Sequence, residues 1–427
     1  MNINDSLNDI GRKSLVASNQ VKNFTSEEKN NLLTKIAEKI NSDKELILNA
    51  NQKDISIATD SIDKAMLDRL ALNSDRVDSI INSINDIVLL EDPINKVINK
   101  NERPNGMLVE RVSVPLGVIG IIYESRPNVT IDASVLCLKA GNSVILRGGK
   151  ESYYSNLQLV TSARNALEES NYDKNIIQFI ETTDRNAVDY MLSEMSHYID
   201  VIIPRGGKGL VKKVQDKAKI PVIGHLDGIC HVYVDEFADK DKAKQVVNNS
   251  KLRRTGICGA AETLLVHKDC IESHLPSIIN ILKSGGCEIR GDEMITKNYP
   301  DLIKANEDDW KTEYLDSIIS IKIVEDVNDA IKHITKYGSN HTESIITENK
   351  ENAEIFLNHV GSAIVMHNTS TQFADGGEFG LGAEIGIATG KLHARGPVGL
   401  EGLTTYKYKV CLLYTSDAAD EGLGVDL

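Results

Sequence analysis

The sequence predicts an α/β protein built from two large lobes and a β-rich arm. The chain has 427 residues, which is too long for one ordinary hydrophobic core. Short, continuous apolar runs alternate with helical stretches in two separate parts of the chain, as in buried parallel strands joined by helices. Right-handed crossovers between such strands give a doubly wound parallel sheet, which we expect in the first lobe.

The composition is that of a soluble globular protein, with 41% hydrophobic and 26% charged residues. A net charge of -14 argues against nucleic acid and anionic membranes as partners. The N-terminal segment lacks the basic start and apolar run of a secretory signal, and no apolar stretch is long enough to span a bilayer. We therefore expect a cytoplasmic protein whose six cysteines are free thiols.

Residues 1–100 are expected to form helices that pack on the first lobe. Thr25 to Glu28 and Ser42 to Glu45 both fit a capping box, and apolar residues recur at helical spacing after them. Residues 101–115 then read as a hairpin arm that opens with a turn at Arg103 to Gly106. Paired with a late strand at 403–410, this arm predicts exchange between subunits and a homo-oligomer.

The first lobe is assigned to residues 116–250 and contains the strands expected at 118–123, 143–147, 176–180, 201–203 and 222–223. Ligands of doubly wound sheets bind at the carboxyl ends of the strands. Arg147 and Lys150 follow one strand, and Gly206 and Gly207 follow another and lead into a helix, where exposed N–H groups suit a phosphate. These four residues predict a polyanionic cofactor. The spacing fits neither GxGxxG nor GxxxxGK[ST], and a surface turn with solvated charges is the alternative.

The rest of the chain is divided into three parts. A second α/β lobe, expected to be the catalytic domain, spans 251–367, with strands at 263–266, 317–321 and 344–346 and helices at 271–282 and 327–337. A glycine-rich segment, 368–402, returns to the first lobe and is too rich in glycine for regular structure. Residues 411–427 continue neither a strand nor a helical pattern and are assigned to a disordered or non-native tail.

Cys258 is the candidate nucleophile. It lies between glycines, shortly after Arg253 and Arg254 and just before an apolar run, which describes a thiol at a tight turn in an electropositive setting. The thiolate is the reactive form of cysteine, and nearby cations lower the thiol pKa. A small buried residue in a turn is the alternative for a cysteine taken by itself. His341 has no second histidine or cysteine at metal-ligand spacing, so we expect a hydrogen-bonding loop residue and no metal site.

Four segments resemble the aldehyde dehydrogenase superfamily, and within it the enzymes that reduce an acyl phosphate. The segments are 115–130, 251–262, 341–345 and 393–408, and the resemblance covers roughly residues 5 to 410. It implies the fold of that superfamily: a cofactor domain, a catalytic domain and an oligomerisation arm. It also implies an NADP-dependent reductase that converts L-glutamate 5-phosphate to L-glutamate 5-semialdehyde in proline biosynthesis, with glutamate 5-kinase as a functional partner.

The resemblance assigns roles to individual residues. Cys258 matches the nucleophile of the superfamily, and Glu313 matches the acid that holds the nicotinamide ribose. Arg147 stands where a lysine contacts the adenine ribose, and an arginine there suits the 2′-phosphate of NADP. Ser125 replaces the asparagine that donates to the oxyanion in aldehyde oxidisers. The candidate substrate-binding residues are Arg126, Arg253, Arg254, His341 and Thr342.

The position of the water-activating glutamate of aldehyde oxidisers is occupied by His225. A reductase that releases phosphate does not hydrolyse a thioester, so loss of that base fits the implied reaction. Arg126, Arg253 and Arg254 are each expected either to bind the leaving phosphate or to pair with an acidic side chain. The competing interpretations are a CoA-acylating aldehyde dehydrogenase, which uses the same thioester chemistry, and a non-catalytic oligomeric scaffold of the same fold.

Overall fold

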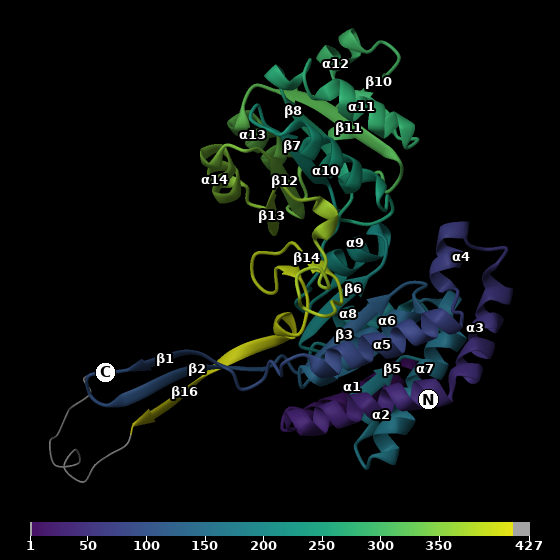
Figure 1. The fold of residues 1–427 in the computed structure, drawn as a ribbon. Helices are drawn as coiled ribbons and strands as arrows, with labels where there is room; N and C mark the ends of the chain where they lie inside the picture. Colours follow the sequence, from purple (N-terminus) through teal and green to yellow (C-terminus); the bar gives the residue numbers. More distant parts are fainter. Residues whose placement is uncertain (1, 413–427) are drawn as a thin grey trace. The chain divides into compact units, whose positions relative to one another are not determined.

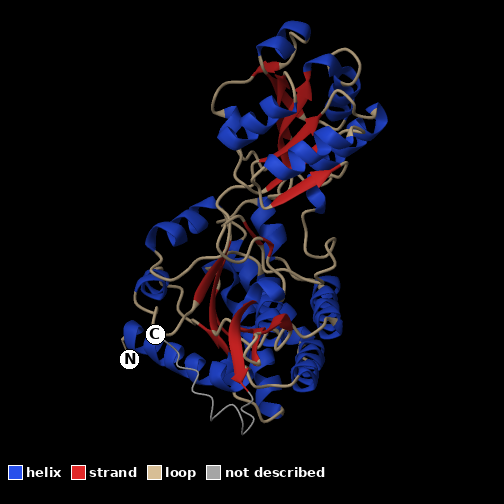
Figure 2. Cartoon of the chain, turned by 90° about the vertical axis from the view of Figure 1, so that its left-hand side faces the viewer, coloured by secondary structure: helices blue, strands red, loops and turns tan. Residues whose placement is uncertain are grey.

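The computed structural model describes residues 2–412. The described chain forms two compact units, one from residues up to Ile202 together with the segment from Leu400, and one from Ile203 to Gly399. Figures 1 and 2 show the helices and strands of the described chain. No helix among the described residues is long and apolar enough to cross a membrane.

Unit 1 begins with five helices, and of the two predicted capping boxes the one at Ser42 to Glu45 was wrong, because Ser42 ends the second helix and the N-cap of the third is Asp43, which makes no side-chain cap bond. Thr25 and Glu28 form the reciprocal bonds of a capping box at the start of the second helix. The apolar stripes of these helices are buried, and α2 packs on α5 and on the later α7. The helices are α1 (Ile3–Val21), α2 (Ser26–Ser42), α3 (Lys44–Ala58), α4 (Lys64–Leu70) and α5 (Ser74–Leu89).

The central sheet of unit 1 has four strands in the order β5-β4-β3-β6. Strands β3 and β4 are parallel and fully buried, which is why their sequences are continuous apolar runs. β4 and β5 extend the sheet on one side of β3, whereas β6 lies on the other side, as in a doubly wound sheet. The elements are β3 (Val118–Tyr123), α6 (Pro127–Lys139), β4 (Ser143–Arg147), α7 (Tyr153–Glu169), β5 (Ile177–Phe179), α8 (Asn186–Ser193) and β6 (Val201–Arg205).

A separate antiparallel sheet joins the hairpin to the late strand. It contains β1 (Val97–Glu102), β2 (Met107–Pro115) and β16 (Thr404–Leu412), in the order β1-β2-β16. Gly106, with φ +79°, closes the hairpin turn between the first two strands. β16 extends through Cys411 and Leu412, which both pair with β2, so for these two residues the disorder in the predicted disordered or non-native tail was wrong. The remainder of the predicted tail, 413–427, lies outside the described residues.

Unit 2 contains a seven-stranded parallel sheet in the order β10-β9-β11-β8-β7-β12-β13. Helices α10 and α11 bury apolar side chains on one core cluster, and α13 and α14 contribute to a second cluster with Tyr233 and Leu265 of the sheet. The strands are β7 (Cys230–Val234), β8 (Ala261–His267), β9 (Glu288–Gly291), β10 (Ile303–Lys304), β11 (Ile318–Val324), β12 (Thr342–Ile346) and β13 (Ile364–His367). The helices are α9 (Lys208–Lys217), α10 (Lys240–Leu252), α11 (Leu275–Ser284), α12 (Glu293–Asn298), α13 (Val327–Tyr337) and α14 (Lys350–His359).

The observed architecture confirms the predicted α/β fold class. The boundary between units differs, because the units divide after Ile202, whereas the sequence pattern placed residues up to 250 in the first lobe. β7 pairs with β8 and β12, so this strand belongs to the seven-stranded sheet. Buried parallel strands look alike in either lobe, which explains the difference. The segment at 222–223 forms no strand among the described elements. The glycine-rich segment contains the short strands β14 (Ile387–Ala388) and β15 (Gly396–Pro397), the 3-10 turn η5 (Thr371–Phe373) and the start of η6 (Glu401–Leu403).

Candidate active site

Three neighbouring strands of unit 2 begin side by side and bring distant residues together. β8, β7 and β12 are adjacent and parallel, so their amino ends meet at one edge of the sheet. Cys258 precedes β8, Cys230 is the first residue of β7, and His341 directly precedes β12. The order of the strands therefore collects two cysteines and a histidine that are far apart in the sequence.

The turn that carries Cys258 follows α10 and leads into β8. The Ala260 N–H donates to the Ile257 carbonyl at 3.0 Å, which closes the turn. Gly228 packs against it so closely that a Cβ there would lie 2.3 Å from the Cys258 carbonyl oxygen. Only glycine permits this approach of two backbones. The chain from 228 to 230 thus fixes the position of Cys258 from the neighbouring strand.

A buried ion pair holds the two ends of this turn together. Lys251 Nζ lies 2.6 Å from Glu262 Oε2, and both side chains are fully buried. The other Glu262 oxygen accepts the Leu315 N–H at 3.2 Å. Burial raises the pKa of Glu262, and the Lys251 ammonium opposes that change. The turn is therefore anchored at both ends by groups that are costly to leave unpaired.

Cys258 is half-buried, and its surroundings favour the thiolate. Burial by itself raises the thiol pKa, but the positive charges of His341 and Arg205 lower it more. The Glu313 carboxylate opposes them. The net result is a Cys258 pKa below its ordinary value, as a nucleophile requires.

His341 lies at the centre of the group and is fully buried. Its Nδ1 atom is 2.9 Å from Thr342 Oγ1 and 3.5 Å from the Cys230 sulfur. Its Nε2 atom is buried and has no hydrogen-bond partner among the described residues. A buried imidazole nitrogen without a partner is uncommon and marks a place where another group is expected to bind.

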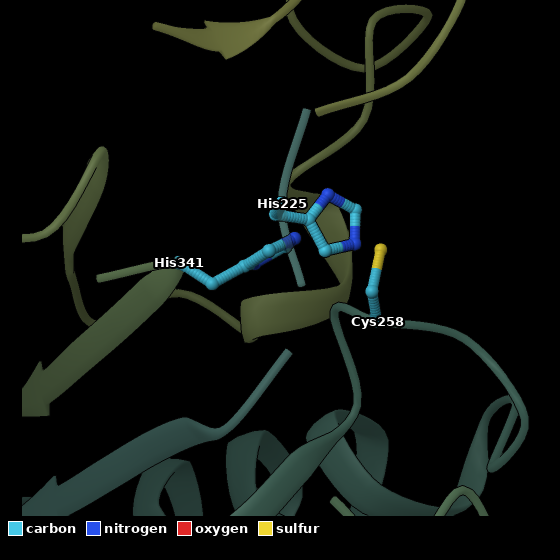
Figure 3. Close-up of side chains that lie close together, drawn as sticks. All are labelled: His225, Cys258 and His341. Atoms are coloured by element: carbon cyan, nitrogen blue, oxygen red, sulfur yellow. The ribbon is translucent and has the colours of Figure 1, made fainter. Parts of the chain in front are cut away.

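His225 completes the group from a loop before β7. Its Nδ1–H donates to the Ile387 carbonyl at 2.6 Å, which leaves Nε2 as the free nitrogen. Burial lowers the pKa of His225, so the ring is held neutral. The rings of His225 and His341 meet edge to face with centroids 4.8 Å apart. Figure 3 shows the two imidazoles and the Cys258 thiol converging from three separate segments.

Glu313, predicted to hold the nicotinamide ribose, lies beside this group. Its Oε1 accepts the Gly228 N–H at 2.9 Å. Burial raises the pKa of Glu313, and its charge is felt by both Cys258 and His225. The structure therefore brings Cys258, His341, Thr342 and Glu313 together in unit 2, although they come from three different loops.

The two arginines next to the thiol in sequence occupy the outer side of the turn. Arg253 is exposed, forms an ion pair with Glu378 at 3.3 Å and stacks over Phe373. Arg254 is also exposed. The cation whose charge reaches Cys258 is instead Arg205, at the end of β6. Sequence reasoning missed it as a site residue, although it directly precedes the glycine turn at 206–207.

The predicted cofactor residues occupy strand ends, as expected from the sequence. Gly207 is the N-cap of α9 and makes no side-chain cap bond there. Arg147 ends β4 but is almost fully buried, and its guanidinium donates to the Gly148, Thr183 and Asp184 carbonyls. Lys150 is exposed. The contact of Arg147 with a 2′-phosphate stays a prediction: the carbonyls engage both terminal nitrogens, while its buried Nε has no hydrogen-bond partner among the described residues.

Ser125 and Arg126 lie in unit 1, between β3 and α6. Ser125 is buried, and its Oγ has no hydrogen-bond partner among the described residues. Gly149 allows the neighbouring loop to approach, since a Cβ there would lie 3.2 Å from the Ser125 nitrogen. Arg126 lines a cavity of about 420 Å³ within unit 1 together with Arg69 and Arg76. The roles of Ser125 in the oxyanion site and of Arg126 in phosphate binding stay predictions.

The metal-ligating capacity of His341 differs from the expectation based on spacing. His225, Cys258 and His341 each offer one ligand atom, and these atoms lie within 4.8 Å of one another. Spacing could not reveal this group, because its members precede different strands. The sequence argument that His341 lacks partners was therefore wrong about the three-dimensional neighbourhood.

Comparisons with known proteins identify the family of the chain. Residues 5–287 match the model of the aldehyde dehydrogenase family. Gamma-glutamyl phosphate reductase of Brucella suis is 51% identical over 403 residues, which cover 94% of this chain and 96% of the relative. The Bartonella henselae protein of that name is 51% identical over 405 residues, with 95% and 98% covered.

Solved structures lead to the same family. The crystal structure of gamma-glutamyl phosphate reductase from Thermotoga maritima has a TM-score of 0.94 at 46% identity, covering 96% of this chain and 99% of that one. An acetylating aldehyde dehydrogenase from Geobacillus thermoglucosidasius has a TM-score of 0.67 at 16% identity, with 97% of each chain covered, and shows the common fold alone.

Proposed function

The chain belongs to the gamma-glutamyl phosphate reductase family of the aldehyde dehydrogenases, and we propose on this premise that it reduces L-glutamate 5-phosphate to L-glutamate 5-semialdehyde with NADPH. As a reductase of proline biosynthesis it would release inorganic phosphate. The observation that carries the proposal is the Cys258 thiol, whose pKa is lowered beside His341 and Arg205. A thiolate in a cationic setting is suited to attack an acyl phosphate.

In the first step, the Cys258 thiolate attacks the acyl carbon of the substrate. The C–O bond to phosphate then breaks, phosphate departs with the bonding electron pair, and a Cys258 thioester remains. Support for this step comes from the neutral state of His225, because an uncharged imidazole does not add a proton to the site. Backbone N–H groups of the Cys258 turn, with Ser125, are the proposed oxyanion donors, each typically contributing roughly 3 to 4 kcal/mol.

Bound NADPH would supply the hydride that reduces the thioester carbonyl. The residues proposed to hold it are Arg147, Lys150, Gly206, Gly207 and Glu313. They fit the group because the N-terminus of α9 presents the positive end of its helix dipole, which suits a phosphate, and Glu313 is an acceptor for ribose hydroxyls. After reduction, the thiohemiacetal on Cys258 collapses to the aldehyde and returns the thiolate.

The leaving phosphate requires cations that an acidic protein must supply locally. Arg126, Arg253 and Arg254 are the candidates from sequence, and we add Arg205 because its charge already acts on Cys258. Arg253 is paired with Glu378, so it would have to exchange that partner for phosphate. His341 and Thr342 are proposed to contact the substrate from the amino end of β12.

We also propose a homo-oligomer formed through β1, β2 and β16. Tyr406, Tyr408 and Val410 alternate along β16 and are 50%, 61% and 58% exposed, so this strand presents a row of large apolar side chains of the kind that a subunit contact covers. If Tyr408→Asp leaves the sedimentation mass unchanged, this surface is not the contact. A cytoplasmic location and supply of the substrate by glutamate 5-kinase complete the proposal.

The decisive measurement is the phosphate dependence of NADP reduction with glutamate 5-semialdehyde as substrate. The proposal requires no turnover without phosphate and saturable turnover with it, because phosphate must resolve the Cys258 thioester. Turnover with CoA in place of phosphate would favour the acylating alternative. No turnover with either acceptor, from folded protein, would favour the non-catalytic scaffold.

A further inference from the structure

The group formed by His225, Cys258 and His341 has a second chemical capacity. Two imidazoles and one thiol are the side chains from which proteins build zinc sites with three protein ligands and one open position. Their ligand atoms lie within 4.8 Å of one another. In a tetrahedral zinc site the ligand atoms are separated by roughly 3.5 Å, as follows from bond lengths of about 2.0 to 2.3 Å. Small side-chain rotations therefore bring the three atoms to bonding distance.

The hydrogen bonds of His225 and His341 involve Nδ1 of each ring, so Nε2 of each ring is available to bind a metal ion. The His225 Nδ1–H donates to the Ile387 carbonyl, which can only accept, so the Nε2 lone pair of His225 is available. His341 Nδ1 faces Thr342 Oγ1 and the Cys230 sulfur. Metal-binding histidines are oriented in the same way, with the second nitrogen bonded to a carbonyl or another polar group.

The buried Nε2 atom of His341 is an independent sign of a missing partner. His341 is fully buried, and this nitrogen has no hydrogen-bond partner among the described residues. A buried hydrogen-bonding group without a partner is destabilising. A metal ion bonded to Nε2 would satisfy it.

We propose that the substrate-free protein binds one zinc-class divalent cation through His225 Nε2, Cys258 Sγ and His341 Nε2, with water in the fourth position, and that this ion reversibly blocks the Cys258 thiol. Soft thiolate and imidazole ligands select zinc over magnesium or calcium. The metal–sulfur bond uses the sulfur lone pair with which Cys258 would attack an alkylating agent or a substrate. Any thiol proton leaves to solvent as the metal–sulfur bond forms, and no oxidant or reductant is needed. Metal binding does not depend on the proposed function, whereas the effect of the ion on catalysis does.

The test uses the full chain, freed of metal with EDTA, and Co²⁺ as a spectroscopic probe for zinc. We expect one Co²⁺ per chain, with a near-ultraviolet cobalt–thiolate band that Zn²⁺ abolishes by displacement. Zn²⁺ should slow iodoacetamide labelling of Cys258 by at least about 10-fold, and EDTA should restore it. These readouts need neither NADPH nor substrate, so they separate failure of this proposal from failure of the proposed function.

Three variants and one matched control locate the ion. Cys258→Ala should abolish the thiolate band, and His225→Ala and His341→Ala should each weaken Zn²⁺ binding more than about 10-fold, since even loss of an outer-shell partner costs 10 to 100-fold. The control is His267→Ala, which removes the histidine from the other three-residue group, Glu236, His267 and Asp269. Full binding in this control is expected.

Two results would overturn the proposal. One is the absence of a thiolate band and of labelling protection at micromolar metal in the parent protein. The other is metal binding that survives Cys258→Ala and disappears in His267→Ala, which would assign the ion to the second group. Cys258→Ala removes only the sulfur atom from a half-buried position and is expected to fold. This variant therefore tests the proposal even if the histidine variants misfold.

Discussion

Two neighbouring segments of unit 2 each carry a cysteine, and the pKa values of the two thiols are shifted in opposite directions. Cys230, at the start of β7, is fully buried, and burial, reinforced by nearby negative charge, raises its pKa far above the ordinary value. Cys258, on the adjoining turn, also loses solvation, yet its pKa is lowered because His341 and Arg205 face it. The Cys230 sulfur lies 3.1 Å from the Cys258 carbonyl and donates to it.

This comparison shows that proximity to the site does not make a thiol reactive. Both sulfurs lie near His341, but Cys230 uses its S–H as a structural donor to the turn, whereas the Cys258 sulfur faces cations and the free imidazole nitrogens. The thiolate fraction, and with it nucleophilicity, follows from the charges that each sulfur meets. Four measurements test that difference.

The largest effect is expected from exchanging the thiols for hydroxyls one at a time. Cys258→Ser should lower kcat/KM by more than about 10⁴-fold, because a serine lacks the accessible anion. Cys230→Ser retains a donor toward the turn and should stay within about 10-fold of the parent. Steady-state NADP reduction with phosphate measures both. Equal losses in the two variants would show that Cys230 takes part in the chemistry.

The next largest effect concerns the ion pair that anchors the Cys258 turn. Glu262→Gln removes the charge that compensates buried Lys251 and should cost about 3 to 5 kcal/mol of unfolding free energy. The measurement is urea unfolding at pH 8, so that the carboxyl, whose pKa burial raises, is ionised in the parent. Trp310, the single tryptophan, lies in unit 2 and reports its unfolding by fluorescence.

The matched control for this variant is an exposed ion pair of the same unit. Lys268 and Glu325 are 2.6 Å apart but largely exposed, so Glu325→Gln should cost less than about 1 kcal/mol. If the two variants have the same unfolding midpoint, the buried pair does not stabilise the turn.

A smaller effect is expected from removing the imidazole that faces Cys258. His341→Gln takes away the group that most strongly opposes the effect of burial on the thiol, so the Cys258 pKa should rise. Turnover at pH 7 should fall about 10²-fold, the lower range for a lost acid–base group. His359→Gln, at an exposed histidine of α14, is the control and should leave turnover unchanged. An unaltered pH profile in His341→Gln would contradict the assigned interaction.

The smallest change is a difference in labelling rate between thiols of the unaltered protein. Because the Cys258 pKa is below 9.0, its thiolate fraction exceeds that of an ordinary thiol at every pH below that value, and the advantage fades as the pH rises above it. Iodoacetamide should therefore label Cys258 faster than exposed Cys411 at pH 7, in EDTA-treated protein, as followed by peptide mass spectrometry. Faster labelling of Cys411 would reverse the assignment.

The sequence was most informative where local pattern and burial agree. Continuous apolar runs predicted β3, β4, β8 and β12 closely, and the period of apolar residues gave α13 its observed bounds, Val327–Tyr337. The extension of β16 to Leu412 was missed because an exposed strand with an irregular pattern has no burial signal. β7 was not predicted as a strand, and its residues were assigned to the first lobe because its own sequence does not say which sheet it joins.

What the sequence determined by itself was the fold class, the turn that presents Cys258 and the cationic character of that turn. These follow from residue order over short distances: glycines beside a cysteine, arginines before it and an apolar strand after it. Only the tertiary structure decided that His225, His341 and Arg205 surround the thiol while Arg253 turns outward to Glu378. The physical reason is the strand order β8-β7-β12, which brings to one edge of the sheet the amino ends of strands that begin at residues 261, 230 and 342.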